Sequence, residues 1–257
     1  MPRIRTYGLD IDTMRYAQRI KSGSGVTILP EPLKQINKFV VGIKKLGLWN
    51  SMVCWPMRSI HNAGTGSTVY SLGGLGVYNG AMVNSPTWRT DGIVTSSSLS
   101  QTITTNTNST LILNRGSLGH VVKPTSNFVN AYYNRWFPSA WNFIGFTGGG
   151  LFRPTLQDGT TGGSQEVSLN SPNNGLSFES KLFSWDSSQV IANLNLTQTT
   201  TVNQTRIPVF NSTSHILSEG NATNSFGIVF NTSLTRDFYL LYYTLYKRTL
   251  GIGLNLP

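Results

Sequence analysis

The residues best suited to recognising a ligand form an aromatic cluster. Within twelve residues, around Arg135, the chain carries Tyr132, Tyr133, Trp136, Phe137, Trp141 and Phe143. Flat aromatic rings stack on sugar rings, and an arginine donates hydrogen bonds to hydroxyl groups. The cluster therefore predicts glycan contacts from Tyr133, Arg135 and Trp136. Because side chains alternate along a strand, packing of these rings in the core is the competing interpretation.

A second pair of candidate glycan contacts follows a predicted strand. Trp185 and Asp186 stand just after the segment 176–183, where a loop would carry them to the rim of a β-domain. Glycoside hydrolysis would need two carboxylates about 5–10 Å apart, which on one strand means neighbours at i, i+2 and i+4. The chain has no such triplet, since Glu179 and Asp186 are seven residues apart and Glu166 stands alone. We therefore expect no enzyme and no catalytic residues.

Residue types that hold metals are scattered along the chain. The three histidines, His61, His120 and His215, have no second ligand at close spacing. We expect them on the surface or in turns, and we expect no metal or cofactor. Cys54 is the one cysteine; it stands in an apolar run and is predicted to be a small core residue.

The net charge of +10 is concentrated near the N-terminus, where residues 1–58 carry ten lysines and arginines against three acidic residues. A basic segment on a nearly neutral body predicts contact with an acidic partner, and a solvated helix face is the alternative. The side chains predicted to anchor the chain to a particle are Arg3, Arg5, Arg15, Arg19, Lys34 and Lys38. Nucleic acid is disfavoured as the partner because these residues lie far in sequence from the aromatic cluster.

Membrane insertion is not expected either. The chain has no run of 18 apolar residues, and its charged start lacks the apolar stretch of a signal peptide.

Two N-terminal elements must position the basic residues. Residues 1–29 are expected to form an extended arm, with room for a short helix at 10–20 and a flexible break at 22–25. Residues 30–47 are expected to form an amphipathic helix. Its lysines would face outward, and its apolar face would pack on the β-body or, alternatively, on another subunit. That face consists of Leu33, Ile36, Val40 and Ile43.

Residues 48–257 are predicted to be mainly β, forming a two-sheet antiparallel jelly-roll sandwich. Short apolar runs recur at roughly 8–15 residues, separated by turn signals such as Asn79-Gly80. The strands are expected at 68–72, 80–83, 92–95, 101–105, 110–113, 128–133, 141–146, 150–152, 166–169, 176–183, 190–194, 198–202, 207–210 and 225–230. A last helix is expected after Thr235, with one apolar face formed by Phe238, Leu241, Tyr242 and Leu245.

Three segments carry a resemblance to a known family. They are Gly47-Leu48-Trp49, the stretch 70–93 with Tyr78-Asn79-Gly80 and Asp91-Gly92-Ile93, and the close from Phe226-Gly227-Ile228-Val229-Phe230 to the C-terminal Pro257. Together they resemble phage virion structural proteins with a concanavalin A-like (laminin-G-like) lectin/glucanase domain. Many members have an Asp- and Asn-rich turn where this chain has the Gly-rich segment 72–76, so a calcium contact there is not expected.

The resemblance implies a structural component of a virion. Such a head-fibre, decoration or tail-associated protein would have other virion proteins and further copies of itself as partners, with the basic N-terminal region as its anchor. The alternative function is a carbohydrate-binding adhesin module that recognises host surface glycans.

Overall fold

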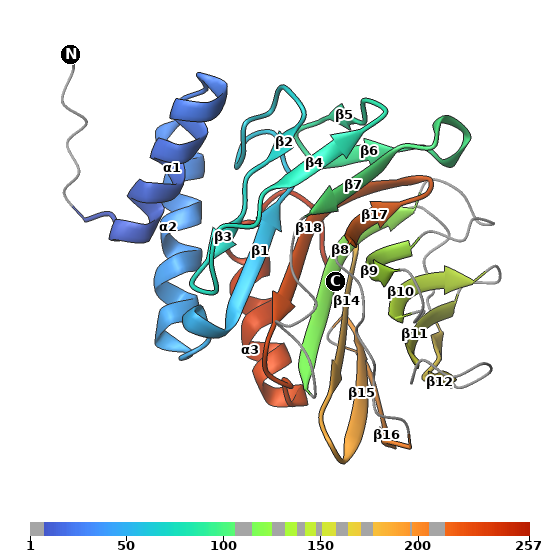
Figure 1. Cartoon of the computed structure of the whole chain (residues 1–257). Coiled ribbons are helices and arrows are strands. Elements are labelled where there is room, and N and C mark those ends of the chain that lie inside the picture. The colour runs from blue at the N-terminus through green and yellow to red at the C-terminus, as the bar shows by residue number, and fades with distance from the viewer. Residues whose placement is uncertain are drawn as a thin grey trace.

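Two antiparallel β-sheets and a layer of helices make up the protein (Figure 1). The computed structural model describes residues 8–105, 115–124, 132–137, 142–147, 151–157, 164–170, 177–195, 197–205 and 214–257. Within these residues each sheet has nine strands, and three α-helices cover the outer face of one sheet. The prediction of a mainly β, two-sheet antiparallel sandwich is confirmed.

The first sheet lies between the helices and the second sheet. Its strand order is β16 (Gln198–Asn203), β15 (Gln189–Leu194), β14 (Glu179–Trp185), β8 (Gly116–Pro124), β18 (Ala222–Phe230), β1 (Met52–Pro56) and β3 (Leu72–Gly73). The short strand β6 (Ile93–Thr95) also pairs with β18 and carries β5 (Thr87–Trp88).

The second sheet closes the sandwich. Its order is β12 (Ser164–Glu166), β11 (Leu151–Gln157), β10 (Asn142–Thr147), β9 (Tyr132–Phe137), β17 (Ser214–Glu219), β7 (Thr102–Thr105), β4 (Gly80–Val83) and β2 (Thr68–Val69), and β13 (Leu169–Asn170) pairs with β11. Two 3-10 turns, η1 (Trp49–Ser51) and η2 (Ser97–Leu99), lie in the connections. For β9 and β10 the description covers the backbone alone.

Most predicted strands lie within a few residues of observed ones, but β8, β17 and β5 were not predicted. β8 is the neighbour of both β14 and β18, and almost all of its residues are buried. A strand covered on both faces has no inside–outside alternation, so its sequence GSLGHVVKP does not read as a strand. The predicted strands 110–113 and 207–210 lie outside the described residues.

One predicted strand and its turn are arranged differently from expectation. The run 68–72 crosses between the sheets, because β2 pairs with β4 in the second sheet and β3 pairs with β1 in the first. Asn79-Gly80 is not a tight turn: Gly80 already pairs with Val69, and Oδ1 of Asn79 accepts a hydrogen bond from the Ser71 amide at 3.1 Å.

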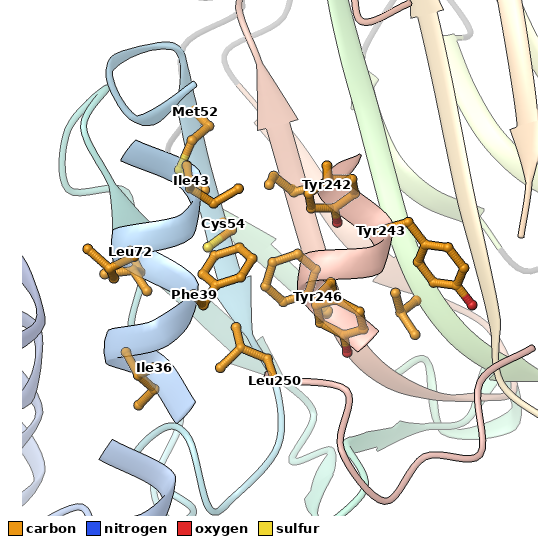
Figure 2. Packing of buried hydrophobic residues seen from close by; sticks show 14 of the residues in the cluster. Ile36, Phe39, Ile43, Met52, Cys54, Leu72, Tyr242, Tyr243, Tyr246 and Leu250 are labelled. Carbon is orange, nitrogen blue, oxygen red and sulfur yellow. The ribbon is translucent and has the colours of Figure 1, made fainter. Parts of the chain in front are cut away.

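Helix α2 (Pro30–Lys45) packs on the β-body as predicted, with Ile36, Phe39, Val40 and Ile43 buried. The ring of Phe226 on β18 stands between two helices, 5.8 Å from the Phe39 ring and 4.7 Å from the Tyr246 ring of α3 (Arg236–Lys247). Figure 2 shows side chains of α2, β1 and α3 meeting there. The helices and the first sheet thus share one apolar core, and a second core lies between the sheets.

The extended arm predicted over residues 1–29 is wrong for its described part, whereas the short helix expected at 10–20 is present and longer than expected. Residues 11–24 form helix α1 (Ile11–Ser24), whose Tyr16 and Ile20 are completely buried in the core beneath the helices. The expected break at 22–25 is the end of this helix, where Gly25 adopts a φ of 77° and its amide donates to the Lys21 carbonyl. A left-handed glycine ends a helix without bringing flexibility.

The face predicted for the last helix is only half right, because Tyr242 is buried and Leu245 packs against the core but the other two residues do not. Phe238 and Leu241 are 41% and 53% exposed, whereas Tyr239, Tyr242, Tyr243 and Tyr246 face the sheet. Tyrosine packs well when its hydroxyl finds a partner. Here Tyr239 reaches the Ser180 hydroxyl at 3.3 Å and Tyr246 reaches the Ser225 hydroxyl at 3.2 Å.

No helix among the described residues has the length and apolar character that crossing a membrane requires.

Candidate functional site

The predicted glycan contacts Tyr133, Arg135 and Trp136 all belong to β9. This strand lies between β10 and β17 in the second sheet, and the backbone of Trp136 pairs with His215. The side chains of these three residues lie outside the described part of the structure. Their contact with a glycan stays a prediction.

The pair Trp185 and Asp186 was predicted to reach the rim of the domain, and for Trp185 this is wrong. Trp185 is completely buried between the sheets, with its ring 5.5 Å from that of Phe183. Asp186 shapes the β14–β15 hairpin, because its Oδ1 accepts hydrogen bonds from the Ser188 and Gln189 amides at 2.8 and 3.0 Å. Partial burial alone would raise the pKa of Asp186, but these hydrogen bonds hold it below the ordinary value.

The histidines were expected on the surface or in turns; His61 does lie in a turn, but all three are buried. Burial, reinforced by the charge of Arg58, lowers the pKa of His61 to about 3. Burial also lowers the pKa of His120 to about 3, and the charge of Lys181 adds to this effect while a hydrogen bond with Asn224 opposes it. Burial and the neighbouring His120 hold the pKa of His215 well below its ordinary value. These rings are neutral parts of the core at neutral pH.

Glu179, one of the carboxylates considered above for hydrolysis, is also buried and is bound to a lysine. Glu179 and Lys181 both project from β14 and form a completely buried ion pair of 3.0 Å. Burial lowers the pKa of Lys181 to about 7, although the carboxylate of Glu179 acts in the opposite direction. The pair is closed off from solvent and has no route to a substrate.

An open pocket of about 430 Å³ lies instead between α1, η1 and β3. One stripe of α1 faces it, because residues three or four apart share a helix face. The lining residues are Asp12, Arg15, Gln18, Arg19 and Ser22 of α1, Trp49 of η1, Leu72 and Gly73 of β3, and Val77. Polar donors and an aromatic residue thus meet in one concave surface.

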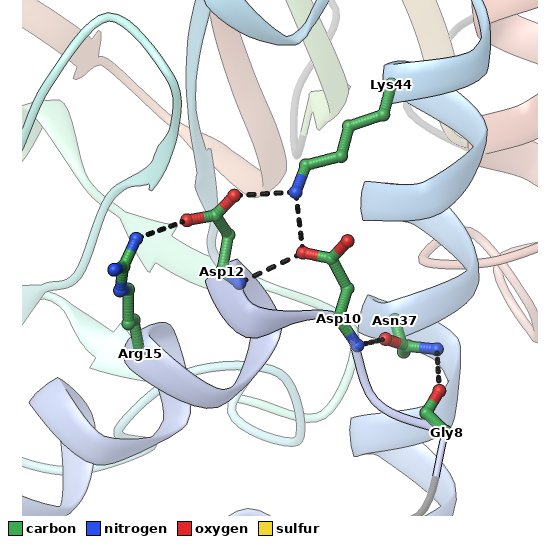
Figure 3. A network of polar contacts seen from close by, with 6 residues as sticks. All are labelled: Gly8, Asp10, Asp12, Arg15, Asn37 and Lys44. Carbon is green, nitrogen blue, oxygen red and sulfur yellow. Dashed lines mark hydrogen bonds and ion pairs between the residues drawn. The ribbon is translucent and has the colours of Figure 1, made fainter.

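A network of polar contacts fixes the start of α1 against α2 (Figure 3). The carboxylate of Asp10 caps the helix by accepting a hydrogen bond from the Asp12 amide at 2.9 Å. Lys44 donates to both Asp10 and Asp12 at 2.7 Å, and Asn37 accepts a hydrogen bond from the Asp10 amide at 2.7 Å. Partial burial alone would raise the pKa of Asp10, but the hydrogen bond and charge of Lys44 hold it below its ordinary value.

Farther along α1, three contacts hold the helix to the β-body. The hydroxyl of Tyr16 donates to the His61 carbonyl at 2.9 Å, and Nη2 of Arg19 donates to the Ser71 carbonyl at 2.7 Å. Gly23 lies so close to Tyr70 that a Cβ there would overlap the tyrosine hydroxyl. The pocket wall is therefore anchored at both ends.

The opposite wall depends on Gly73. Its φ is 151°, and a Cβ at this position would lie 2.3 Å from the carbonyl oxygen of Met52. The Gly-rich segment that was noted for lacking acidic residues thus serves close backbone packing. Among the residues that the structure describes, no cluster of three histidine, cysteine or acidic side chains is arranged to hold a metal ion.

The residues predicted as particle anchors divide into three sets. Arg3 and Arg5 lie outside the described residues. Arg15 and Arg19 face the pocket, while Lys34 and Lys38 are exposed on α2 as predicted. The i, i+3 and i+4 recurrence of polar residues in α1 is visible in the sequence, but nothing local indicates that Trp49 and β3 complete the pocket.

No model of a known protein family and no curated protein matches the sequence. Among solved structures, the binding domain of botulinum neurotoxin DC in complex with SialylT matches with a TM-score of 0.56 at 12% identity, over 76% of this chain and 51% of that chain. A structure described by the dependence of botulinum neurotoxin type C cell entry on two ganglioside molecules has a TM-score of 0.58 at 12% identity, over 78% and 53%. The Trypanosoma rangeli sialidase has a TM-score of 0.51 at 11% identity, over 86% and 40%.

This chain spans about half the length of the neurotoxin domains that it matches. At such low identity the likeness establishes the fold, which is a lectin-like β-sandwich.

Proposed function

We propose that this chain is a non-catalytic carbohydrate-binding protein and that the pocket between α1 and β3 holds the sugar. The observation that carries the proposal is the meeting of Arg15, Gln18, Arg19 and Trp49 in one cavity of about 430 Å³. Ligand pockets in proteins have volumes of about 300–1,000 Å³ and combine apolar walls with a few polar groups that orient the ligand. Guanidinium and amide groups match the hydroxyl oxygens of a sugar.

Two further observations support a binding role. Two of the neurotoxin structures of similar fold are described with SialylT or with ganglioside molecules. Two of the three carboxylates considered for hydrolysis, Glu179 and Asp186, are engaged in the core and in a hairpin turn. We expect a bound sugar to be released without hydrolysis. The pocket lining contains one carboxylate, Asp12, and that group is held by Arg15 and Lys44.

A glycan array with matched variants tests the proposal. Arg15 is the test residue and Lys34 is its matched control. Each is the cation of an i, i+3 ion pair, and their side chains are 69% and 65% exposed. Wild-type protein and Lys34→Ala should bind the same glycans, and Arg15→Ala should lose most of the signal. A blank array, or equal binding by both variants, would count against this site.

The β9 residues provide a second arm of the same experiment. If Trp136→Ala lost binding while Arg15→Ala bound fully, the binding site would be assigned to β9 instead of the pocket. Trp185→Ala is unsuitable as a probe because its ring is core. Incubation with capsular or cell-wall polysaccharides should release no new reducing ends, and their appearance would refute a non-catalytic role.

A second candidate function is that of a virion component, displayed in many copies as a head-fibre, decoration or tail-associated protein. One observation favours it. An apolar groove of about 530 Å³ is lined by the residues just before α1, the α1–α2 connection and α2, with Leu29 68% exposed and the basic residues Lys34 and Lys38 on its lining. Such a surface suits an acidic, partly apolar partner in a particle.

Charge reversal tests this anchor better than truncation, because deletion of residues 1–29 would remove Tyr16 and Ile20 from the core. Lys34→Glu combined with Lys38→Glu should abolish incorporation into particles. Lys45→Glu, which changes an exposed lysine of the same helix away from the groove, should incorporate normally. Normal incorporation of the double variant would refute anchoring through this groove.

A further inference from the structure

The α1 pocket carries a positive charge that no described carboxylate balances. Asp12 is the acidic residue in its lining, and its two oxygens already meet Arg15 at 3.3 Å and Lys44 at 2.7 Å. Lys44 is also bound to Asp10, so these two carboxylates neutralise Arg15 and Lys44. The guanidinium of Arg19 makes no ion pair with any residue in the described part of the chain.

The hydrogen bonds of Arg19 leave capacity unused. A guanidinium has five N–H donors and no acceptor. Arg19 spends Nη2 on the Ser71 carbonyl at 2.7 Å, whereas its Nη1 is shielded from solvent and has no hydrogen-bond partner. An unpaired buried donor is costly, so a ligand oxygen that supplied Nη1 with a hydrogen bond would remove this cost.

Arg15 supplies a second, more accessible cation. It stands four residues before Arg19, so both side chains lie on the same face of α1. Its Nη1 is 3.3 Å from Asp12, which is a long ion pair, and the side chain is 69% exposed. The two guanidinium groups therefore approach one cavity from one helix, with Gln18 and Ser22 beside them.

We infer that the pocket selects acidic sugars, whose carboxylate or sulfate oxygens are bound by Arg15 and Arg19. This inference rests on the proposed function, since it names the class of glycan that the same pocket takes. Guanidinium groups bind planar or tetrahedral anions with paired hydrogen bonds that are stronger than those to neutral oxygens. A neutral sugar would leave the charge of Arg19 uncompensated, so it binds more weakly.

An array that prints each acidic glycan beside its carboxyl-reduced or desulfated counterpart tests the inference. Binding to the acidic form should exceed binding to its neutral counterpart by about 10- to 100-fold, the range expected for one or two charge-assisted hydrogen bonds. The two kinds of counterpart distinguish carboxylate from sulfate recognition. Equal binding to neutral glycans would overturn the inference and leave the proposed function standing, whereas no binding to any glycan would overturn both.

Two variants tie the selectivity to the pocket. Arg15→Gln changes an exposed side chain and should lower the affinity for the acidic glycan about tenfold, with little effect on its neutral counterpart. Lys34→Gln, the matched control on α2, should change neither. Arg19→Lys keeps the charge but loses the planar donors, and its fold is checked by circular dichroism. Unchanged selectivity in Arg15→Gln and in folded Arg19→Lys would overturn the assignment to these residues.

Discussion

The buried histidines make the protein sensitive to mild acid. An unfolded chain binds a proton on each histidine near pH 6.5. In the folded protein His61 and His120 have pKa values of about 3, and burial holds the pKa of His215 lower than its ordinary value as well. Between about pH 6.5 and pH 3 the unfolded chain therefore binds more protons than the folded protein. The free energy of unfolding must then fall as the pH falls.

The size of this effect follows from the number of protons. From pH 7.5 to pH 5.0 each such histidine lowers the free energy of unfolding by about 2 kcal/mol. The chain has three histidines, all buried, so the total approaches about 6 kcal/mol. Natural domains have unfolding free energies of about 5–15 kcal/mol, so the fold is expected to be close to its limit at pH 5.

Urea unfolding at several pH values measures this loss, and variants divide it among the sites. The slope of the unfolding free energy below pH 6 should reach about 4 kcal/mol per pH unit, and His61→Gln should lower that slope by about one third. The slope is the useful readout because it does not depend on how stable the variant is at neutral pH. Proton NMR of the folded protein should show no imidazole titration above pH 5. A ring that titrates near pH 6.5, or a wild-type loss below about 2 kcal/mol, would refute the reasoning.

Three other perturbations have expected results that stability measurements can check. Glu179→Gln or Lys181→Met alone should lower the free energy of unfolding by about 3 kcal/mol, because each leaves a buried ionisable group without its partner, and the double variant should recover most of it; additive losses would contradict this. Arg58→Met should lower it by about 3 kcal/mol and speed proteolysis of the C-terminal tail, because Arg58 donates to two carbonyls of residues 250–252; an unchanged cleavage rate would disprove the second effect. Gly73→Ala should lower the free energy of unfolding by about 2 kcal/mol or more, because a Cβ there meets a β1 carbonyl; a wild-type melting temperature would show that the backbone of β3 adapts.

The sequence predicted the elements whose residues carry a local signal. Helix α2 was found because its apolar residues recur at helical spacing, and those residues pack on the β-body as expected. β4 was predicted at its observed bounds, 80–83, because it is short and bounded by turn residues. In each case one face of the element is buried and the other is exposed, and this difference produces the periodic recurrence of apolar residues in the sequence.

The predictions that failed concern elements whose buried and exposed faces do not differ in hydrophobicity in the usual way. β8 is buried on both sides, so its sequence shows no alternation. In α3 the buried tyrosines are more polar than the exposed Phe238 and Leu241, so hydrophobicity alone favours the wrong face. The burial of His120 has a similar cause: its hydrogen-bond partner Asn224 comes from the distant strand β18, and no local pattern in the sequence indicates that partner.

The candidate pocket was beyond sequence reasoning for a further reason. Its residues come from α1, η1 and β3, which are brought together by contacts as distant as Arg19 with the Ser71 carbonyl and Tyr16 with the His61 carbonyl. The layers of the fold explain why the pocket opens at the edge of the helical layer. Both faces of the first sheet are covered, one by the helices and one by the second sheet. A ligand that approaches this side of the molecule therefore meets the edge of the helical layer rather than a sheet face. There α1 uses one face to complete the apolar core, while another face carries the exposed Arg15 and the half-buried Arg19 that line the pocket.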